Sequence, residues 1–253
     1  MNGTNRHNIL RYQDGAFSKA EDLLAVESRM SISINGEDVL SVYCTPLMVR
    51  ELAVGLIMTE GLAEGLCSER MSIMYENDGV RVDAHAEGEV RKSGGTVTSG
   101  CVGGVTFTKK ASPTVMDDPF SIGAPALTGL FRRFQKRSEM YNTTGCIHSA
   151  ALSDGDEIMA FAEDIGRHNA VDKVIGYALI EGIDFSGKIM MASGRLSSEI
   201  VGKCARWGIP MVVSRAAATA LAVKIAEDSG VTTVGFLRGE RFNIYTHPHR
   251  VTA

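Results

Sequence analysis

The sequence predicts an α/β protein, α+β overall, in which a β-rich first half precedes a second half of alternating strands and helices. In the first half, apolar and polar residues alternate around Asn35-Gly36, a dipeptide typical of hairpin turns. In the second half, short apolar runs alternate with segments of helical apolar spacing, which indicates a largely parallel sheet covered by helices. The pattern changes near residues 116–119, which predicts a smaller domain over 1–118 and an α/β domain over 119–253.

One helix is expected within the first half. Thr45 can cap its N-terminus, Pro46 fits its first turn, and Gly61 ends it. Its apolar face consists of Val49, Leu52, Ala53 and Leu56. A second turn, at residues 77–79, follows the helix and separates two further strands.

The second half begins with a helix that has one apolar and one basic face. The apolar face holds Leu127, Leu130, Phe131 and Phe134, and the basic face holds Arg132, Arg133, Lys136 and Arg137. The expected strands are 147–152, 157–162, 188–192, 210–214 and 232–237, with a possible edge at 243–246. The helices expected between them are 168–181, 197–207 and 218–228.

Composition excludes several classes of protein. The net charge of −4 over 253 residues gives no general attraction to nucleic acid or to an anionic membrane. Residues 1–15 are polar and lack the apolar core of a signal peptide, and no apolar run approaches the roughly 20 residues that span a bilayer. The five cysteines are widely spaced without a Cys-x-x-Cys pair, which argues against a disulfide framework or a structural zinc site. We therefore expect a reduced, cytoplasmic protein.

Four predicted strands of the second half end in polar loops that carry arginine. The loop residues are Asp164, Gly166, Arg167 and His168; Ser193, Gly194 and Arg195; Ser214 and Arg215; and Phe236, Leu237, Arg238, Gly239, Glu240 and Arg241. Ligands of open α/β sheets bind at the carboxyl ends of the strands, and the planar guanidinium of arginine suits phosphate. The loop at 193–198 also begins a helix, whose free N–H groups favour an anion. The pattern favours an anionic ligand, and the carboxylate of Asp164 could accept hydrogen bonds from guanine. The alternative is that these residues are helix caps and ion pairs.

Cys101 lies in a loop of glycines and small hydroxyl residues, over 92–104. Arg91, Lys92, Lys109 and Lys110 flank the loop, and nearby cations favour the reactive thiolate. The alternative is an incidental cysteine, because free cysteines are usually inert packing residues.

The other cysteines carry weaker signals. Cys204 lies on an apolar helix face and is expected in the core, and Cys44 and Cys67 are expected to be structural. Cys146 and His148 lie on one face of a strand, but two ligands without a third make a poor metal site.

Several of these motifs together resemble one known family. They are Thr45-Pro46, residues 51–61, Cys101 in its glycine loop, the block Glu163-Asp-Ile-Gly-Arg-His-Asn-Ala-Val-Asp-Lys173, residues 193–199 and residues 238–247. Over about residues 20 to 250 the chain resembles the formate dehydrogenase accessory sulfurtransferase (FdhD) family. The resemblance implies a cytoplasmic homodimer that passes sulfur from a cysteine desulfurase to the molybdenum cofactor of formate dehydrogenase. It also implies that the second half has the three-layer fold of cytidine deaminases without their zinc.

The resemblance also implies roles for particular residues. Guanine nucleotide (GDP-like) portions of the bis-molybdopterin guanine dinucleotide cofactor would bind at the arginine-rich strand ends, and residues 236–241 match the cofactor-binding segment of the family. Cys101 matches the first cysteine of the family motif Cys-Gly-x-Cys-Gly, which is expected to carry a persulfide. Gly104 stands in the place of the second cysteine, so exchange between two neighbouring motif thiols is excluded, whereas a relay through one cysteine remains chemically sufficient.

Two other functions stay open at this point. In the first, the protein is a non-enzymatic chaperone of the molybdenum cofactor, and Cys101 is dispensable. In the second, it is a nucleotide-converting enzyme of deaminase-like fold, which the absence of the zinc-deaminase signature disfavours.

Overall fold

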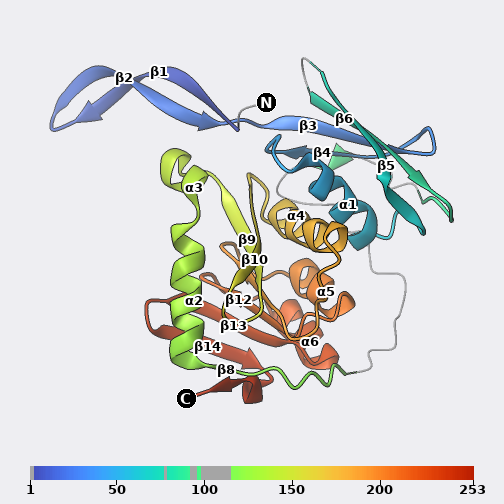
Figure 1. The fold of residues 1–253 in the computed structure, drawn as a ribbon. Coiled ribbons are helices and arrows are strands. Elements are labelled where there is room, and N and C mark those ends of the chain that lie inside the picture. The colour runs from blue at the N-terminus through green and yellow to red at the C-terminus, as the bar shows by residue number, and fades with distance from the viewer. Residues whose placement is uncertain (1–2, 77–78, 92–95, 98–114) are drawn as a thin grey trace.

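The computed structural model describes residues 3–76, 79–91, 96–97 and 115–253. Figure 1 shows a two-stranded arm, a small sheet that is covered by helix α1, and a larger domain of sheet and helices below them.

The arm is an antiparallel pair of β1 (Thr4–Gln13) and β2 (Ala16–Ala25). The sequence pattern predicts no strand here, because neither face of the pair is buried and the apolar residues therefore do not alternate strictly. Leu10, Tyr12 and Phe17 are each more than 60% exposed, and the rings of Tyr12 and Phe17 lie 5.1 Å apart beside the turn.

The small sheet confirms both predicted hairpins. Its strand order is β5–β6–β3–β4–β7, with β3 (Ser28–Ile34), β4 (Glu37–Cys44), β5 (Leu66–Tyr75), β6 (Gly79–Ala86) and β7 (Thr96–Val97). Between β3 and β4, Asn35 and Gly36 have φ values of 52° and 83°, as a two-residue hairpin turn of this hand requires. Strand β3 also pairs in parallel with β6. The sheet shares one apolar core with α1.

Helix α1 (Val49–Thr59) forms where a helix was predicted, but it begins later. Its N-cap is Met48, in the left-handed conformation, so the prediction that Thr45 caps the helix was wrong. Thr45 is fully buried and instead contacts the larger domain, where its hydroxyl accepts a hydrogen bond from the Ile165 N–H at 3.2 Å. Gly61, with φ of 63°, follows the end of the helix as expected.

The larger domain is built on a six-stranded mixed sheet in the order β10–β9–β11–β12–β13–β14. Its strands are β9 (His148–Ser153), β10 (Ile158–Asp164), β11 (Ile189–Ala192), β12 (Met211–Ser214), β13 (Thr232–Arg238) and β14 (Arg241–Thr246). All six match predicted strands. The parallel pairs are β11 with β12 and β12 with β13, at the centre of the sheet. The other three pairs are antiparallel: β9–β10 and β13–β14 are hairpins, and β9 also pairs antiparallel with β11. The sheet is therefore mixed rather than largely parallel as predicted, because β9 and β14 both run against the other four strands.

Helices cover both faces of this sheet, which gives three layers (Figure 1). On one face lies α2 (Ala124–Lys136), whose Leu127, Phe131 and Phe134 share a core with alternate residues of the strands. On the other face lie α4 (Arg167–Ile180), α5 (Ser198–Arg206) and α6 (Ala220–Ser229). The short elements are α3 (Glu139–Thr144), the 3₁₀ turn Pro248–Arg250, and β8 (Ile122–Gly123), which pairs with β15 (Val251–Thr252).

The two domains are joined by close packing of α1 on α4. A Cβ atom on Gly55 of α1 would overlap the carbonyl oxygen of Asp172, and one on Gly176 of α4 would overlap that of Glu51. Charged groups are buried in the same interface: the Lys203 ammonium lies 2.6 Å from Asp172 and 3.0 Å from Glu60, and Thr59 donates a hydrogen bond to Asp172 at 2.8 Å. Among the described residues, no helix has the length and apolar character needed to cross a bilayer.

Candidate functional site

The register of the large sheet brings the predicted loops to one edge. The relevant pairs are His148 with Asp164, Ala150 with Ala192, Ala192 with Ser214, and Val213 with Val234. The loops that follow β10, β11, β12 and β13 therefore leave the sheet at the edge where β9 begins. This convergence confirms the predicted placement of the four loops, although it does not identify a ligand.

The loops that follow β10 and β11 are in direct contact with each other and with the start of β9. The hydroxyl of Ser193 accepts a hydrogen bond from the Ser149 N–H at 2.9 Å and lies 3.2 Å from Nδ1 of His148. A Cβ atom on Gly194 would lie 3.0 Å from Cβ of Arg167 and 3.3 Å from the His148 ring, so glycine permits this close approach. His148 belongs to this cluster, although its place in the sequence suggests only half of a metal pair with Cys146. Its position opposite Asp164 in the β9–β10 hairpin was the available signal.

The remaining strand ends continue the edge. The hydroxyl of Ser214 donates to the carbonyl of Gly194 at 2.6 Å and so orders the turn rather than facing outward. The Phe236 N–H donates to the carbonyl of Ala216 at 3.0 Å, and the Arg238 guanidinium lies 5.7 Å from the centre of the Phe236 ring. Phe236 lies within β13, where the register with β14 is irregular, and has a φ of 53°. This conformation is unusual for a bulky residue, and such strained positions cluster at functional sites.

The side chains at this edge differ in their exposure to solvent. The exposed residues are Arg195, Arg215, Arg238, Gly239, Glu240 and Arg241, and Arg167 is half-buried. Leu237 is buried in the core against α2, and the Gly166 N–H donates to Asp164. The guanidinium groups, rather than Leu237 or Ser214, are therefore the groups that can meet an anion.

Asp164 is fully buried, and both of its carboxylate oxygens are engaged. One oxygen accepts hydrogen bonds from the Gly166 N–H and the Asn169 amide, and the other accepts from the Thr45 N–H and lies 2.7 Å from the ammonium of Lys173. This geometry does not support the expectation that Asp164 accepts hydrogen bonds from guanine. It gives the carboxylate a role in joining the two domains.

His168 is also held within the protein. Its Nε2 lies 3.0 Å from the Ser197 hydroxyl and 3.0 Å from the carboxylate of Glu199, which ties α4 to the start of α5. Burial, reinforced by the charge of Arg167, lowers the pKa of His168 to about 3. The same two causes lower the pKa of His148. His168 is therefore neutral at physiological pH, and positive charge at this edge comes from the arginines.

Acid is expected to destabilise the protein partly through His168. Between pH 6.5 and about 3, the unfolded chain binds a proton at this ring and the folded protein does not, so stability falls as the pH falls. The loss through this one group is about 3 kcal/mol at pH 4. Urea unfolding of wild type and of His168→Gln at pH 7 and pH 4 measures it. We expect the variant to lose less stability between the two pH values, and equal losses would contradict the assignment.

Cys101, the predicted carrier, lies outside the described residues, as do Lys92, Lys109 and Lys110. Cys44 and Cys204 are buried, as expected, and burial raises the pKa of each thiol to about 12. Neither is a thiolate at neutral pH. Cys67 is half-buried and Cys146 is exposed. In the described part of the chain, no three His, Cys, Asp or Glu side chains are arranged to hold a metal ion.

Comparison with known proteins then identifies the family. A model of the FdhD/NarQ family matches residues 25–252. The chain belongs to the FdhD/NarQ family. Among its relatives in that family, the sulfur carrier protein FdhD of Wolinella succinogenes is 40% identical over 92% of this chain and 84% of its own. The sulfur carrier protein FdhD of Bacillus pumilus is 36% identical over 96% of each chain.

A solved structure shows the same fold in this family. It is the crystal structure of a protein described as a formate dehydrogenase accessory protein from Desulfotalea psychrophila. The two chains are 25% identical, with a TM-score of 0.78 over 98% of this chain and 99% of the other. The resemblance inferred from the motifs is therefore confirmed at the level of family and fold.

Proposed function

We propose that this protein is a sulfur carrier for the maturation of formate dehydrogenase, and that Cys101 is the carrier thiol. Support comes from membership of the FdhD/NarQ family. It also comes from the two relatives described above, which are both named sulfur carrier protein FdhD. The structural observation that carries the proposal is the meeting of four arginine-bearing loops at one edge of the large sheet. This edge offers a site for an anionic acceptor that is separate in sequence from the thiol.

The proposed chemistry is a sulfurtransferase relay through one cysteine. The Cys101 thiolate attacks the outer sulfur of a persulfide on a cysteine desulfurase, the sulfur–sulfur bond of the donor breaks, and the donor leaves as a thiolate. Cys101 then carries the persulfide. On transfer, the acceptor would supply the electron pair that binds the outer sulfur and so would be oxidised by two electrons, while the sulfur–sulfur bond breaks and Cys101 leaves as a thiolate. Only one thiol is needed, so Gly104 in place of the second motif cysteine does not prevent the reaction.

The proposed acceptor is the bis-molybdopterin guanine dinucleotide form of the molybdenum cofactor, bound as a substrate. Its guanine nucleotide portions would lie against the arginines of the sheet edge, because guanidinium groups bind phosphate through paired hydrogen bonds. The segment at residues 236–241 supplies Arg238 and Arg241 together with the exposed Gly239 and Glu240. We further propose that the protein acts in the cytoplasm as a homodimer.

The test of the carrier chemistry is an adduct on Cys101. The protein is incubated with a cysteine desulfurase and cysteine, its intact mass is measured, and the adduct is located by peptide mapping. We expect one additional sulfur on Cys101 that is absent from Cys101→Ala and retained in Cys146→Ala, the matched exposed thiol. An active desulfurase that leaves no adduct on Cys101 would contradict the proposal. Such a result would favour the second candidate, a cofactor chaperone in which Cys101 is dispensable, which the presence of Gly104 allows.

Guanine nucleotide binding tests the sheet edge separately. Arg167→Ala and Arg195→Ala are each expected to weaken the binding of GDP by about 1–3 kcal/mol, because each removes a charge-assisted hydrogen bond. Isothermal titration calorimetry measures the change. Arg132→Ala, an exposed arginine on α2, serves as the control and should bind like wild type. Unchanged affinity in both edge variants would exclude this site.

A further inference from the structure

A pocket lies at the end of α5 that is far from the sheet edge. Helix α5 begins at Ser198, beside His168 and the candidate site, and ends at Arg206, which lines a pocket of about 320 Å³. The other side of the pocket is the turn that follows α1, from Gly61 to Gly65. The pocket therefore lies between the two domains and is distinct from the proposed cofactor site.

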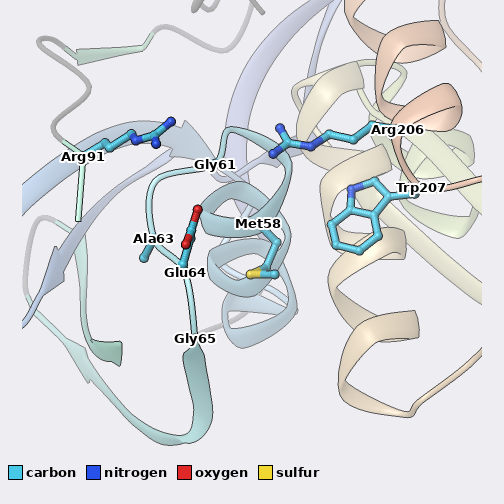
Figure 2. Close-up of a pocket in the computed structure, with 8 residues that line it drawn as sticks. All are labelled: Met58, Gly61, Ala63, Glu64, Gly65, Arg91, Arg206 and Trp207. Carbon is cyan, nitrogen blue, oxygen red and sulfur yellow. The ribbon is translucent and has the colours of Figure 1, made fainter. Parts of the chain in front are cut away.

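Two arginines line the pocket, and the guanidinium of Arg91 also lies 3.3 Å from the carboxylate of Glu89. Figure 2 shows Arg91 and Arg206 reaching toward the Gly61 turn from different parts of the chain. The Arg206 guanidinium is fixed by a hydrogen bond from Nη1 to the carbonyl of Thr59 at 3.0 Å, which leaves Nε and Nη2 as further donors. A Cβ atom on Gly61 would lie 3.2 Å from Nη2 of Arg206, so glycine keeps this face of the guanidinium open. An arginine held in this way is already oriented for a carboxylate.

The remaining walls are apolar, apart from one carboxylate. Met58 and the indole of Trp207 line the pocket, and Glu64 adds an acidic group near the turn (Figure 2). Nε1 of Trp207 is buried and has no hydrogen-bond partner among the described residues. The volume is near the lower end of the range for small-ligand pockets, about 300–1,000 Å³.

We propose that this pocket binds a carboxylate that is attached to an apolar residue and an amide, as at the carboxyl terminus of a peptide or in an N-acyl amino acid. Arg206 and Arg91 bind the carboxylate, Met58 and Trp207 contact the apolar side chain, and Glu64 accepts a hydrogen bond from the amide N–H. Inorganic anions fit less well, because they leave the apolar walls without a partner.

The chain contains one tryptophan, so the fluorescence of Trp207 reports on this pocket alone. N-acetyl-L-leucine is titrated against the whole protein, with the neutral N-acetyl-L-leucinamide as the matched control. We expect a saturable change with the acid and at least tenfold weaker binding of the amide. Arg206→Ala and Arg91→Ala should each lose at least this factor, and Arg132→Ala should not. Arg91 is included because removal of Arg206 also removes the bond to Thr59.

Two peptides separate the sources of the carboxylate. Acetyl-Ala-Ala-Ala-Leu with a free carboxyl terminus should bind at least as tightly as N-acetyl-L-leucine if the occupant is the end of a protein chain, and more weakly if it is a free small acid. The amidated peptide should not compete in either case. Equal responses to acid and amide, or no saturable change up to about 10 mM of either acid, would overturn the proposal. The assay requires no sulfur transfer, so its result is independent of the proposed function.

Discussion

Gly176→Ala is expected to lower the free energy of unfolding by about 3 kcal/mol or more, enough to leave much of a marginal protein unfolded. The added Cβ atom would overlap the carbonyl oxygen of Glu51 and approach the backbone nitrogen of Gly55. Both obstacles belong to the backbone of α1, so no side chain can rotate away. The two helices must separate, and the buried charges between them then lose their partners.

A matched substitution separates this clash from any general effect of replacing a helical glycine. Gly129, in α2, has nothing within 4 Å of where its Cβ atom would lie. Gly129→Ala should therefore be neutral or stabilising, since alanine favours a helix over glycine by about 1 kcal/mol. Urea unfolding followed by circular dichroism measures both variants. Similar midpoints for Gly176→Ala and wild type would show that α1 and α4 are not in contact as described.

Lys173→Met is expected to cost about 3–5 kcal/mol of stability, because it leaves the buried carboxylate of Asp164 without its counterion. Lys173 and Asp164 are both fully buried, and the ammonium also donates hydrogen bonds to the carbonyls of Thr45 and Glu163, at 3.1 and 3.0 Å. Methionine has a similar length and shape, so the main loss is of charge and hydrogen bonds rather than of volume.

The control for Lys173→Met is a lysine whose ion pair is exposed. Lys224 lies 3.4 Å from Asp228 on the surface of α6, with 72% of its side chain accessible. Exposed pairs of this kind contribute about 0–1 kcal/mol, so Lys224→Met should have little effect. The measurement is the urea midpoint at pH 7, with the slope of the transition compared between variants. Losses of equal size in the two variants would contradict the importance of burial at Lys173.

Much of the larger domain could be predicted because its signals are local. The strands from β9 to β13 contain short apolar runs beside turns or helix caps, and the hairpin at Asn35-Gly36 is specified by two residues. The rule that loops meet at the carboxyl ends of parallel strands then placed four loops together. The family followed from motifs such as residues 163–173, which no rule of periodicity would have interpreted.

The errors have a common physical cause in contacts between residues far apart in the sequence. Threonine is a residue type that often caps helices, but Thr45 forms hydrogen bonds with Ile165 and Asp164 of the other domain. Asp164 lies at the carboxyl end of a strand, where ligands often bind, but Lys173 and Thr45 contact its carboxylate and bury it. The β1–β2 arm escaped prediction for the opposite reason, because it packs on no core that would impose a pattern on its residues.

The α1–α4 interface limits which segments of two family members can be combined in one chimaeric protein. Each domain completes the other: Thr59 and Glu60 are partners of Asp172 and Lys203, and Gly55 and Gly176 shape complementary backbones. A chimaera that joined the first domain of one relative to the second domain of another would therefore need both helices from a single parent. Substitutions on α1 and α4 must therefore be compatible as a pair.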